Sequence, residues 1–159
     1  MERVTWYSFV IITCSLLHEI LTGAPPVRLQ LFGVLIWPSA QKFTSYIEDK
    51  LTNHGNIIEK RSCMMSSKKK QQQFIRSLYQ HEFIGQHHHV IRYKQEHCFP
   101  SYAQPRLTCF LYTTTNVLVM KKIKHTLRRV LHQGFHSLHS TDTEKEVAYL
   151  QKLLQFYQD

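Results

Sequence analysis

Hydrophobic and polar residues repeat along this chain with the period of strands in some segments and of helices in others. Residues 27–37 alternate at first and then become continuously apolar, as a buried strand does. Residues 56–65, 106–112 and 135–139 predict three further strands, the last of them short. The chain should therefore contain at least one sheet of four strands.

Helical spacing appears in the segments that follow these strands. Phe43, Tyr46, Ile47 and Leu51 predict a helix that begins near Pro38 and ends near Gly55. Two more helices are predicted over residues 68–79 and 117–131, and a final helix begins near residue 144.

Polar residues mark where the later helices should begin. Asn116 is suited to cap the helix over 117–131. Thr141-x-x-Glu144 and Thr143-x-x-Glu146 both match a capping box, so either threonine can open the last helix.

The predicted elements alternate as strand and helix four times, which defines the fold class. The two long helices, after the first and third strands, favour an α+β fold: a ferredoxin-like (split β-α-β) sandwich with a four-stranded, mostly antiparallel sheet. A parallel doubly wound sheet is the alternative. Residues 81–105 show no firm period and are expected to form a loop with one helical turn, which leaves the second crossover of that alternative poorly supported. Residues 27–159 are predicted to form one domain.

Residues 1–26 form either a signal-peptide-like leader or an N-terminal helix. The apolar run 9–17 and the small residues at 22–24 resemble a secretory signal, which favours the secretory pathway over the cytoplasm. Glu2, His18, Glu19 and Pro25 argue for the alternative, an amphipathic helix packed on the domain. The run is too short to span a bilayer.

The cysteines do not decide between these compartments. The sequence contains no Cys-x-x-Cys pair, which argues against zinc-ribbon and thioredoxin-like sites. Cys63, Cys98 and Cys109 are compatible with one disulfide and a free thiol, or with three buried thiols. The sequence has no Asn-x-Ser/Thr glycosylation site either.

Charge points to an anionic partner. The chain has 20 Lys and Arg against 11 Asp and Glu, a net charge of +9 with histidines neutral. The cations gather at residues 68–70 and along the helix 117–131, a face that suits an acidic protein, an anionic surface or a nucleotide. Nucleic acid is not specifically indicated, because aromatic residues do not alternate with these cations.

Histidines form the other concentration of chemistry-bearing residues. His87, His88 and His89, with His81 and His97 nearby, resemble a transition-metal site, but three consecutive histidines in a loop cannot all face one ion. We therefore expect no metal site there. No phosphate-binding P-loop, G-x-S-x-G or G-x-G-x-x-G motif occurs in the sequence.

Near the end of the chain, His139-Ser140-Thr141-Asp142 precedes a Glu-containing helix, and Ile36-Trp37-Pro38-Ser39-Ala40 ends the first strand. This pattern, over residues 31–157, resembles a divergent nucleoside diphosphate kinase, whose motifs are His-Gly-Ser-Asp and Lys-Pro-Asp-Ala. The resemblance implies that His139 corresponds to the histidine that accepts phosphate, and that Mg²⁺ and a nucleotide are the ligands. It also implies that Arg128 is a remnant of a nucleotide-contacting arginine.

Departures from the family pattern indicate a degenerate relative. The lysine that contacts the transferred phosphate is replaced by Trp37, and the loop before the last strand shrinks to residues 132–134. Phosphoryl transfer requires cations around the phosphate oxygens, so we expect little or no transferase activity. Whether any enzymatic activity remains is left open, with a phosphohistidine kinase as the third hypothesis.

The leading hypothesis is a domain that binds a nucleotide or another anion near His139, Arg128, Thr126 and Lys124. The alternative is a small basic interaction module whose helix 117–131 binds an acidic protein or a membrane surface.

Overall fold

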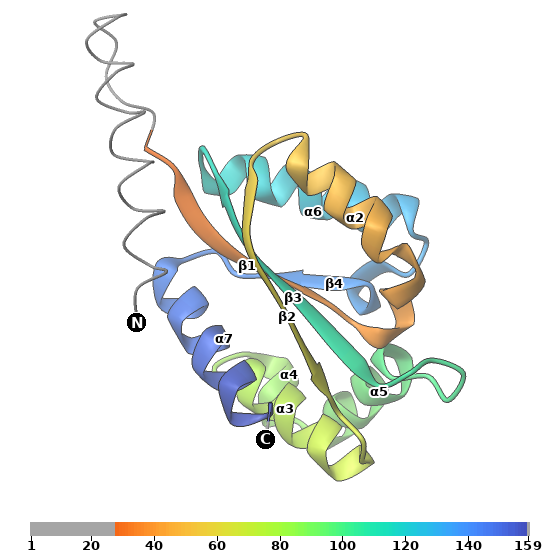
Figure 1. Cartoon of the computed structure of the whole chain (residues 1–159). Coiled ribbons are helices and arrows are strands. Elements are labelled where there is room, and N and C mark those ends of the chain that lie inside the picture. Colours follow the sequence, from red (N-terminus) through yellow and green to blue (C-terminus); the bar gives the residue numbers. More distant parts are fainter. Residues whose placement is uncertain (1–27, 159) are drawn as a thin grey trace, which may run out of the picture.

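A four-stranded antiparallel sheet forms the middle of the molecule (Figure 1). The computed structural model describes residues 28–158, and the predicted leader or N-terminal helix over 1–26 lies outside them. The strands lie in the order β2 (Asn56–Met64), β3 (Arg106–Thr114), β1 (Gln30–Ile36) and β4 (Leu138–Ser140). Within the described residues, no helix has the length and apolar character needed to cross a membrane.

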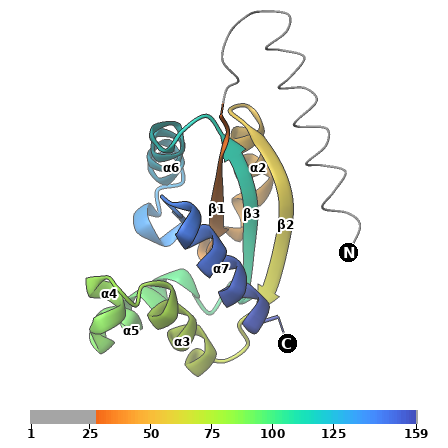
Figure 2. The same cartoon turned by 90° about the vertical axis from the view of Figure 1, so that its left-hand side faces the viewer.

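Helices cover both faces of this sheet (Figures 1 and 2). One face carries α2 (Thr44–Thr52), which follows the 3-10 turn η1 (Pro38–Phe43), and α6 (Val117–Val130). The other face carries α3 (Lys68–Leu78), α5 (His88–Cys98) and α7 (Glu144–Phe156). A single helical turn, α4 (Phe83–Gln86), joins α3 to α5, and a second 3-10 turn, η2 (Gly134–His136), precedes β4.

The strand order confirms the predicted split β-α-β sandwich. β3 lies between β1 and β2, and β1 lies between β3 and β4. Each neighbouring pair is antiparallel, so the parallel doubly wound alternative is wrong. β1 and β3 are central and β4 forms one edge of the sheet.

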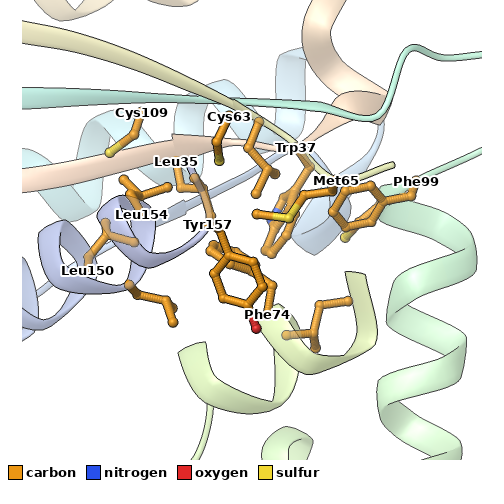
Figure 3. Close-up of a cluster of buried hydrophobic side chains, with 14 of the residues drawn as sticks. Leu35, Trp37, Cys63, Met65, Phe74, Phe99, Cys109, Leu150, Leu154 and Tyr157 are labelled. Carbon is orange, nitrogen blue, oxygen red and sulfur yellow. The ribbon is translucent and has the colours of Figure 1, made fainter. Parts of the chain in front are cut away.

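Two apolar cores, one on each face, hold the layers together. Phe32, Val34 and Ile36 of β1 face α2 and α6, while Leu35 and Trp37 face α3, α5 and α7. This division follows from the strand period, because successive side chains point to opposite faces. In the core beneath α3, α5 and α7, the Phe74 ring meets the rings of Trp37 and Tyr157 edge to face, with centroids 6.1 Å and 5.4 Å away (Figure 3).

The expectation of a loop over residues 81–105 is wrong, because α4 and α5 occupy much of this segment. The buried positions of α5 are Ile91, Lys94, Gln95 and Cys98, which have regular helical spacing. Two of the four are polar, so the helical period is invisible in a hydrophobic pattern. Burial of Gln95 is compensated by a hydrogen bond, in which its side-chain amide donates to Gln71 Oε1 over 2.7 Å.

The fourth strand begins later than the predicted Phe135. Residues 134–136 form η2, and only Leu138–Ser140 pairs with β1. The backbone N–H of Trp37 donates to the Ser137 carbonyl over 3.1 Å. The Phe135 side chain is exposed. His136, which falls within the predicted strand 135–139, therefore lies in a turn.

Predicted caps are found at both later helices. Asn116 Oδ1 accepts from the Leu118 and Val119 amides over 2.9 Å and 3.1 Å, as expected. Of the two candidate threonines, Thr143 caps α7, and its hydroxyl accepts from the Glu146 amide over 3.2 Å.

Cys63, Cys98 and Cys109 are buried free thiols. Burial raises the pKa of Cys63 to about 11, and the pKa values of Cys98 and Cys109 to about 12. These three side chains therefore act as small apolar residues of the core rather than as nucleophiles at neutral pH.

Phe74→Ala should lower the free energy of unfolding by about 3–5 kcal/mol, because it removes a fully buried ring and leaves a cavity. Urea denaturation followed by circular dichroism measures this loss. Phe156→Ala removes the same ring from a position that is 75% exposed and serves as the control, with an expected change of less than about 0.5 kcal/mol. Equal losses in the two variants would contradict this assignment of the core.

Candidate functional site

The candidate site lies at the β4 edge of the sheet. β4 is held there by its pairing with β1, in which His139 lies opposite Leu35. Immediately after β4, the Gly33 N–H donates to Thr141 Oγ1 over 2.8 Å, and the Thr141 N–H donates to the Gly33 carbonyl over 3.0 Å. These bonds fix the start of the His139-Ser140-Thr141-Asp142 motif against the central strand.

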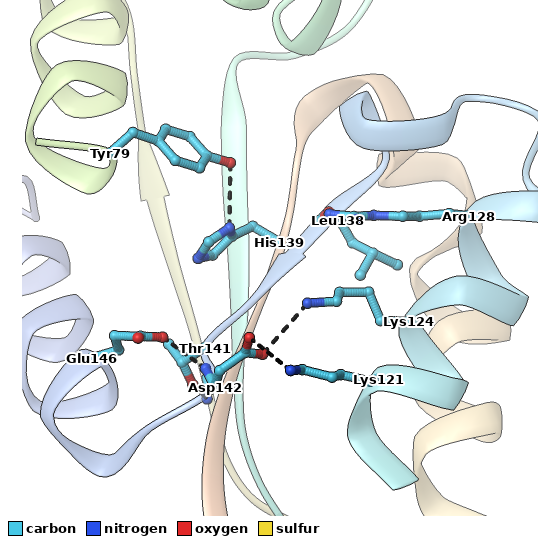
Figure 4. Close-up of polar contacts among 10 residues, drawn as sticks. Tyr79, Lys121, Lys124, Arg128, Leu138, His139, Thr141, Asp142 and Glu146 are labelled. Atoms are coloured by element: carbon cyan, nitrogen blue, oxygen red, sulfur yellow. Dashed lines mark hydrogen bonds and ion pairs between the residues drawn. The ribbon is translucent and has the colours of Figure 1, made fainter. Parts of the chain in front are cut away.

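His139 points toward the face that carries α3 and α5, where it meets Tyr79 (Figure 4). Its Nδ1 lies 3.3 Å from the Tyr79 hydroxyl, and the two rings meet edge to face. Burial, together with the positive charges of Lys124, Lys94 and Arg128, lowers the pKa of His139 from its ordinary value of 6.5 to about 3. The imidazole is therefore neutral at pH 7.

Two cations of α6 reach the same edge from the other face (Figure 4). Arg128 donates through Nε and Nη2 to the Leu138 carbonyl, over 3.3 Å and 2.9 Å, and its guanidinium lies 4.7 Å from the Phe135 ring centroid. Lys124 Nζ lies 3.5 Å from Asp142 Oδ1. These cations are four residues apart and therefore share one face of the helix.

Asp142 is the acidic partner of this cluster. Its carboxylate forms ion pairs with Lys121 and Lys124, whose Nζ atoms each lie 3.5 Å from one of its oxygens. The backbone N–H of Asp142 donates to Glu146 Oε2 over 2.7 Å. This bond links Asp142 to the first turn of α7. One aspartate thus faces two lysines at the β4 edge of the sheet.

Lys94 adds a cation that the sequence pattern does not reveal. The side chain is 4% exposed, and its ammonium donates to the Phe135 carbonyl over 3.0 Å. The same ammonium lies 5.2 Å from the ring centroids of both Trp37 and Tyr79. Burial lowers the pKa of Lys94, and within residues 28–158 no carboxylate pairs with it.

Thr126 does not join the other predicted site residues. It lies two positions from both Lys124 and Arg128, on the opposite side of α6, where it is exposed and lines a groove beside α2. The structure therefore brings together His139, Lys124 and Arg128 and leaves Thr126 elsewhere.

The chemistry available at this edge depends on which imidazole nitrogen is free. Burial raises the pKa of Tyr79 well above its ordinary value of 10, so the phenol is protonated and can donate to Nδ1. A neutral imidazole has one lone pair for a nucleophilic attack, and this bond occupies it. Nε2 becomes nucleophilic only if Nδ1 carries the proton and donates to the Tyr79 oxygen.

Within residues 28–158, no three His, Cys, Asp or Glu side chains gather in a group that could hold a metal ion. His88 and His89 lie in α5, not in a loop. Mg²⁺ is commonly held through substrate phosphates and water, so a bound nucleotide would supply its main ligands.

Sequence reasoning missed Lys94 and the role of Tyr79. Tyr79 falls at the end of the predicted helix 68–79, where an aromatic residue is ordinarily assigned to the core. Lys94 could have been found from its spacing with Ile91 and Cys98, which places all three on one helical face.

The chain matches no protein-family model and no curated protein.

The free energy of unfolding should fall as the pH decreases from 6.5 toward 3. The reason is that His139 binds a proton in the unfolded chain and stays neutral in the folded chain over this range. Urea midpoints of the wild type and of His139→Gln, measured at several pH values, test this. The wild type should lose stability relative to the variant at the acidic end.

His125→Gln, at an exposed position of α6, is the matched control. If the wild type and both variants depend on pH equally, His139 does not have a lowered pKa.

Proposed function

We propose that this chain binds a phosphate-bearing anion, with a nucleotide as the best candidate, at the β4 edge beside His139. The observation that supports the proposal is the gathering of Lys94, Lys121, Lys124 and Arg128 around one short strand. Asp142 is the carboxylate that pairs with two of them. Glu82 and Glu146 also lie close enough to interact with this group. Four cations therefore face three carboxylates, and the remaining positive charge favours an anion.

Donors remain available for such a ligand. The guanidinium of Arg128 uses Nε and Nη2 for the Leu138 carbonyl, out of the five N–H donors that an arginine has. Lys124 is partly buried, which strengthens its attraction for a charged oxygen. Lys94 is more deeply buried and contributes positive potential rather than direct contact.

Lys94 also bears on the resemblance to nucleoside diphosphate kinases. In that family pattern a lysine stands where this chain has Trp37. Here the Lys94 ammonium, which comes from α5, lies 5.2 Å from the centroid of the Trp37 ring. A cation therefore lies near that position although it comes from another element, which supports binding of a phosphate more than it supports phosphoryl transfer.

Catalytic phosphoryl transfer is not part of the proposal. The Tyr79 hydroxyl lies 3.3 Å from His139 Nδ1, and Trp37 is fully buried. Transfer would require an unoccupied nucleophile with cations aligned on the phosphate that moves. We infer that the fold resembles a degenerate kinase that keeps anion binding without efficient turnover.

Lys124→Gln should weaken ATP binding by roughly tenfold or more, because it removes a charge-assisted hydrogen bond. Isothermal titration of the full chain with ATP and Mg²⁺ measures this. Lys69→Gln removes the same charge from an exposed position on α3 and should leave the affinity unchanged.

Inorganic triphosphate and adenosine separate the parts of the ligand. Competition by triphosphate alone would assign the affinity to the phosphates, and competition by adenosine would assign it to the base and sugar. An absence of ATP binding, or equal weakening by Lys69→Gln, would contradict the proposed site.

Incubation with γ-labelled ATP and Mg²⁺ should leave the protein without a stable phosphohistidine. Acid-labile, base-stable label that disappears in His139→Gln would show that His139 accepts phosphate. That outcome would restore the kinase hypothesis and leave anion binding intact.

A further inference from the structure

A second feature of α6 lies away from His139. A groove of about 220 Å³ runs between α2 and α6, on the opposite face of the sheet from Tyr79. Lys50 and His54 line it from the end of α2, and the lining residues of α6 are Val119, Lys122, Ile123, Thr126 and Leu127.

The groove has an apolar floor and a basic rim. Ile123 and Leu127 are nearly buried and belong to the core beneath α6, and Val119 is half-buried beside them. Lys50, Lys122 and His54 are exposed around this floor. The volume is below that of ordinary small-molecule pockets, about 300–1,000 Å³, and suits one large apolar side chain.

The rim cations are without acidic partners inside the described part of the chain. The Lys50 ammonium lies 5.4 Å from the Tyr46 ring centroid and forms no ion pair within residues 28–158. Lys122 likewise has none there. Glu48 is bonded to Lys60 of β2 over 2.8 Å, and Asp49 pairs with neither rim lysine.

Further cations extend this positive surface along α6. His125 and Arg129 are exposed and lie three and seven residues from Lys122, on the same side of the helix. Leu118, at the N-terminal end of α6, is 72% exposed. A ligand for this surface therefore needs an apolar anchor with negative charge on both sides of it.

We propose that the α2–α6 groove binds an acidic peptide segment of a partner protein through one large apolar side chain. The anchor fills the space above Ile123 and Leu127, and flanking carboxylates pair with Lys50 and Lys122. Charge complementarity selects this partner, since the rim offers cations that no carboxylate of residues 28–158 pairs with. The proposal does not depend on the anion site at β4.

A fluorescein-labelled peptide with a central Phe between runs of Asp and Glu tests the proposal by fluorescence anisotropy with the full chain. We expect saturable binding that a matched peptide with Ser for Phe does not show. Lys50→Glu combined with Lys122→Glu should weaken binding by at least tenfold.

Two variants keep the result interpretable. Lys68→Glu combined with Lys69→Glu makes the same change in net charge on α3 and should leave binding unchanged. Thr126→Phe, at an exposed position, fills the groove without removing a cation and should weaken binding. Circular dichroism of each variant verifies that it folds.

Four outcomes would overturn the proposal: no binding of the Phe peptide, equal binding of the Ser peptide, equal weakening by the α3 variant, or no effect of Thr126→Phe. Two others would identify a different occupant. A dimer in light scattering that the Lys50 and Lys122 variant dissociates would assign the groove to a second copy. Binding to phosphatidylserine vesicles, without binding to the peptide, would assign it to a membrane.

Discussion

The candidate site at the β4 edge depends on the attachment of a three-residue strand to β1. Leu138–Ser140 would make a weak strand alone, and its neighbours secure it from both ends. Arg128 donates to the carbonyl of Leu138, the first residue of the strand. After the strand, the Gly33 backbone bonds to the hydroxyl and the N–H of Thr141. Together with the pairing of β4 to β1, these contacts hold His139 in the sheet.

Gly33 leaves room for Leu150 of α7 to pack closely against β1 beside this attachment. A Cβ atom at this position would lie 2.6 Å from Leu150 Cδ2 and 3.4 Å from Thr141 Cγ2. Because glycine has no side chain, α7 can pack directly on β1 and its first residues can reach the edge of the sheet. The close packing of α7 therefore helps to hold Asp142, whose N–H bonds to Glu146 of this helix, beside the lysines of α6.

Much of the fold could be predicted from the sequence because apolar residues carry the period of most elements. The order of strands and helices, the antiparallel sandwich and the Asn116 cap all follow from such patterns. α5 escaped prediction because Lys94 and Gln95 occupy buried positions, and β4 was placed too early because Phe135 resembles a strand residue while its side chain is exposed.

The candidate site was harder to predict than the fold, because its residues come from separate elements. His139, Arg128 and Lys124 were identified from one resemblance and one basic helix, but their convergence follows from the pairing of β4 with β1. Thr126 was grouped with them by proximity in sequence, and helical geometry separates them. Lys94 comes from a segment where Ile91 and Cys98 are the two apolar residues of the buried helical face, so its place there can be inferred from their spacing but not from a run of apolar residues.

The ion pairs of Asp142 have a consequence for ligand valence. Lys121 and Lys124 already share the Asp142 carboxylate, which acts as an internal counter-ion at this edge of the sheet. A monovalent ion such as chloride offers these lysines no more charge than the aspartate does, and it lacks the attachment to the protein backbone. At the proposed anion site, only a multiply charged ligand would compete well with Asp142, so selection would rest on charge density before shape.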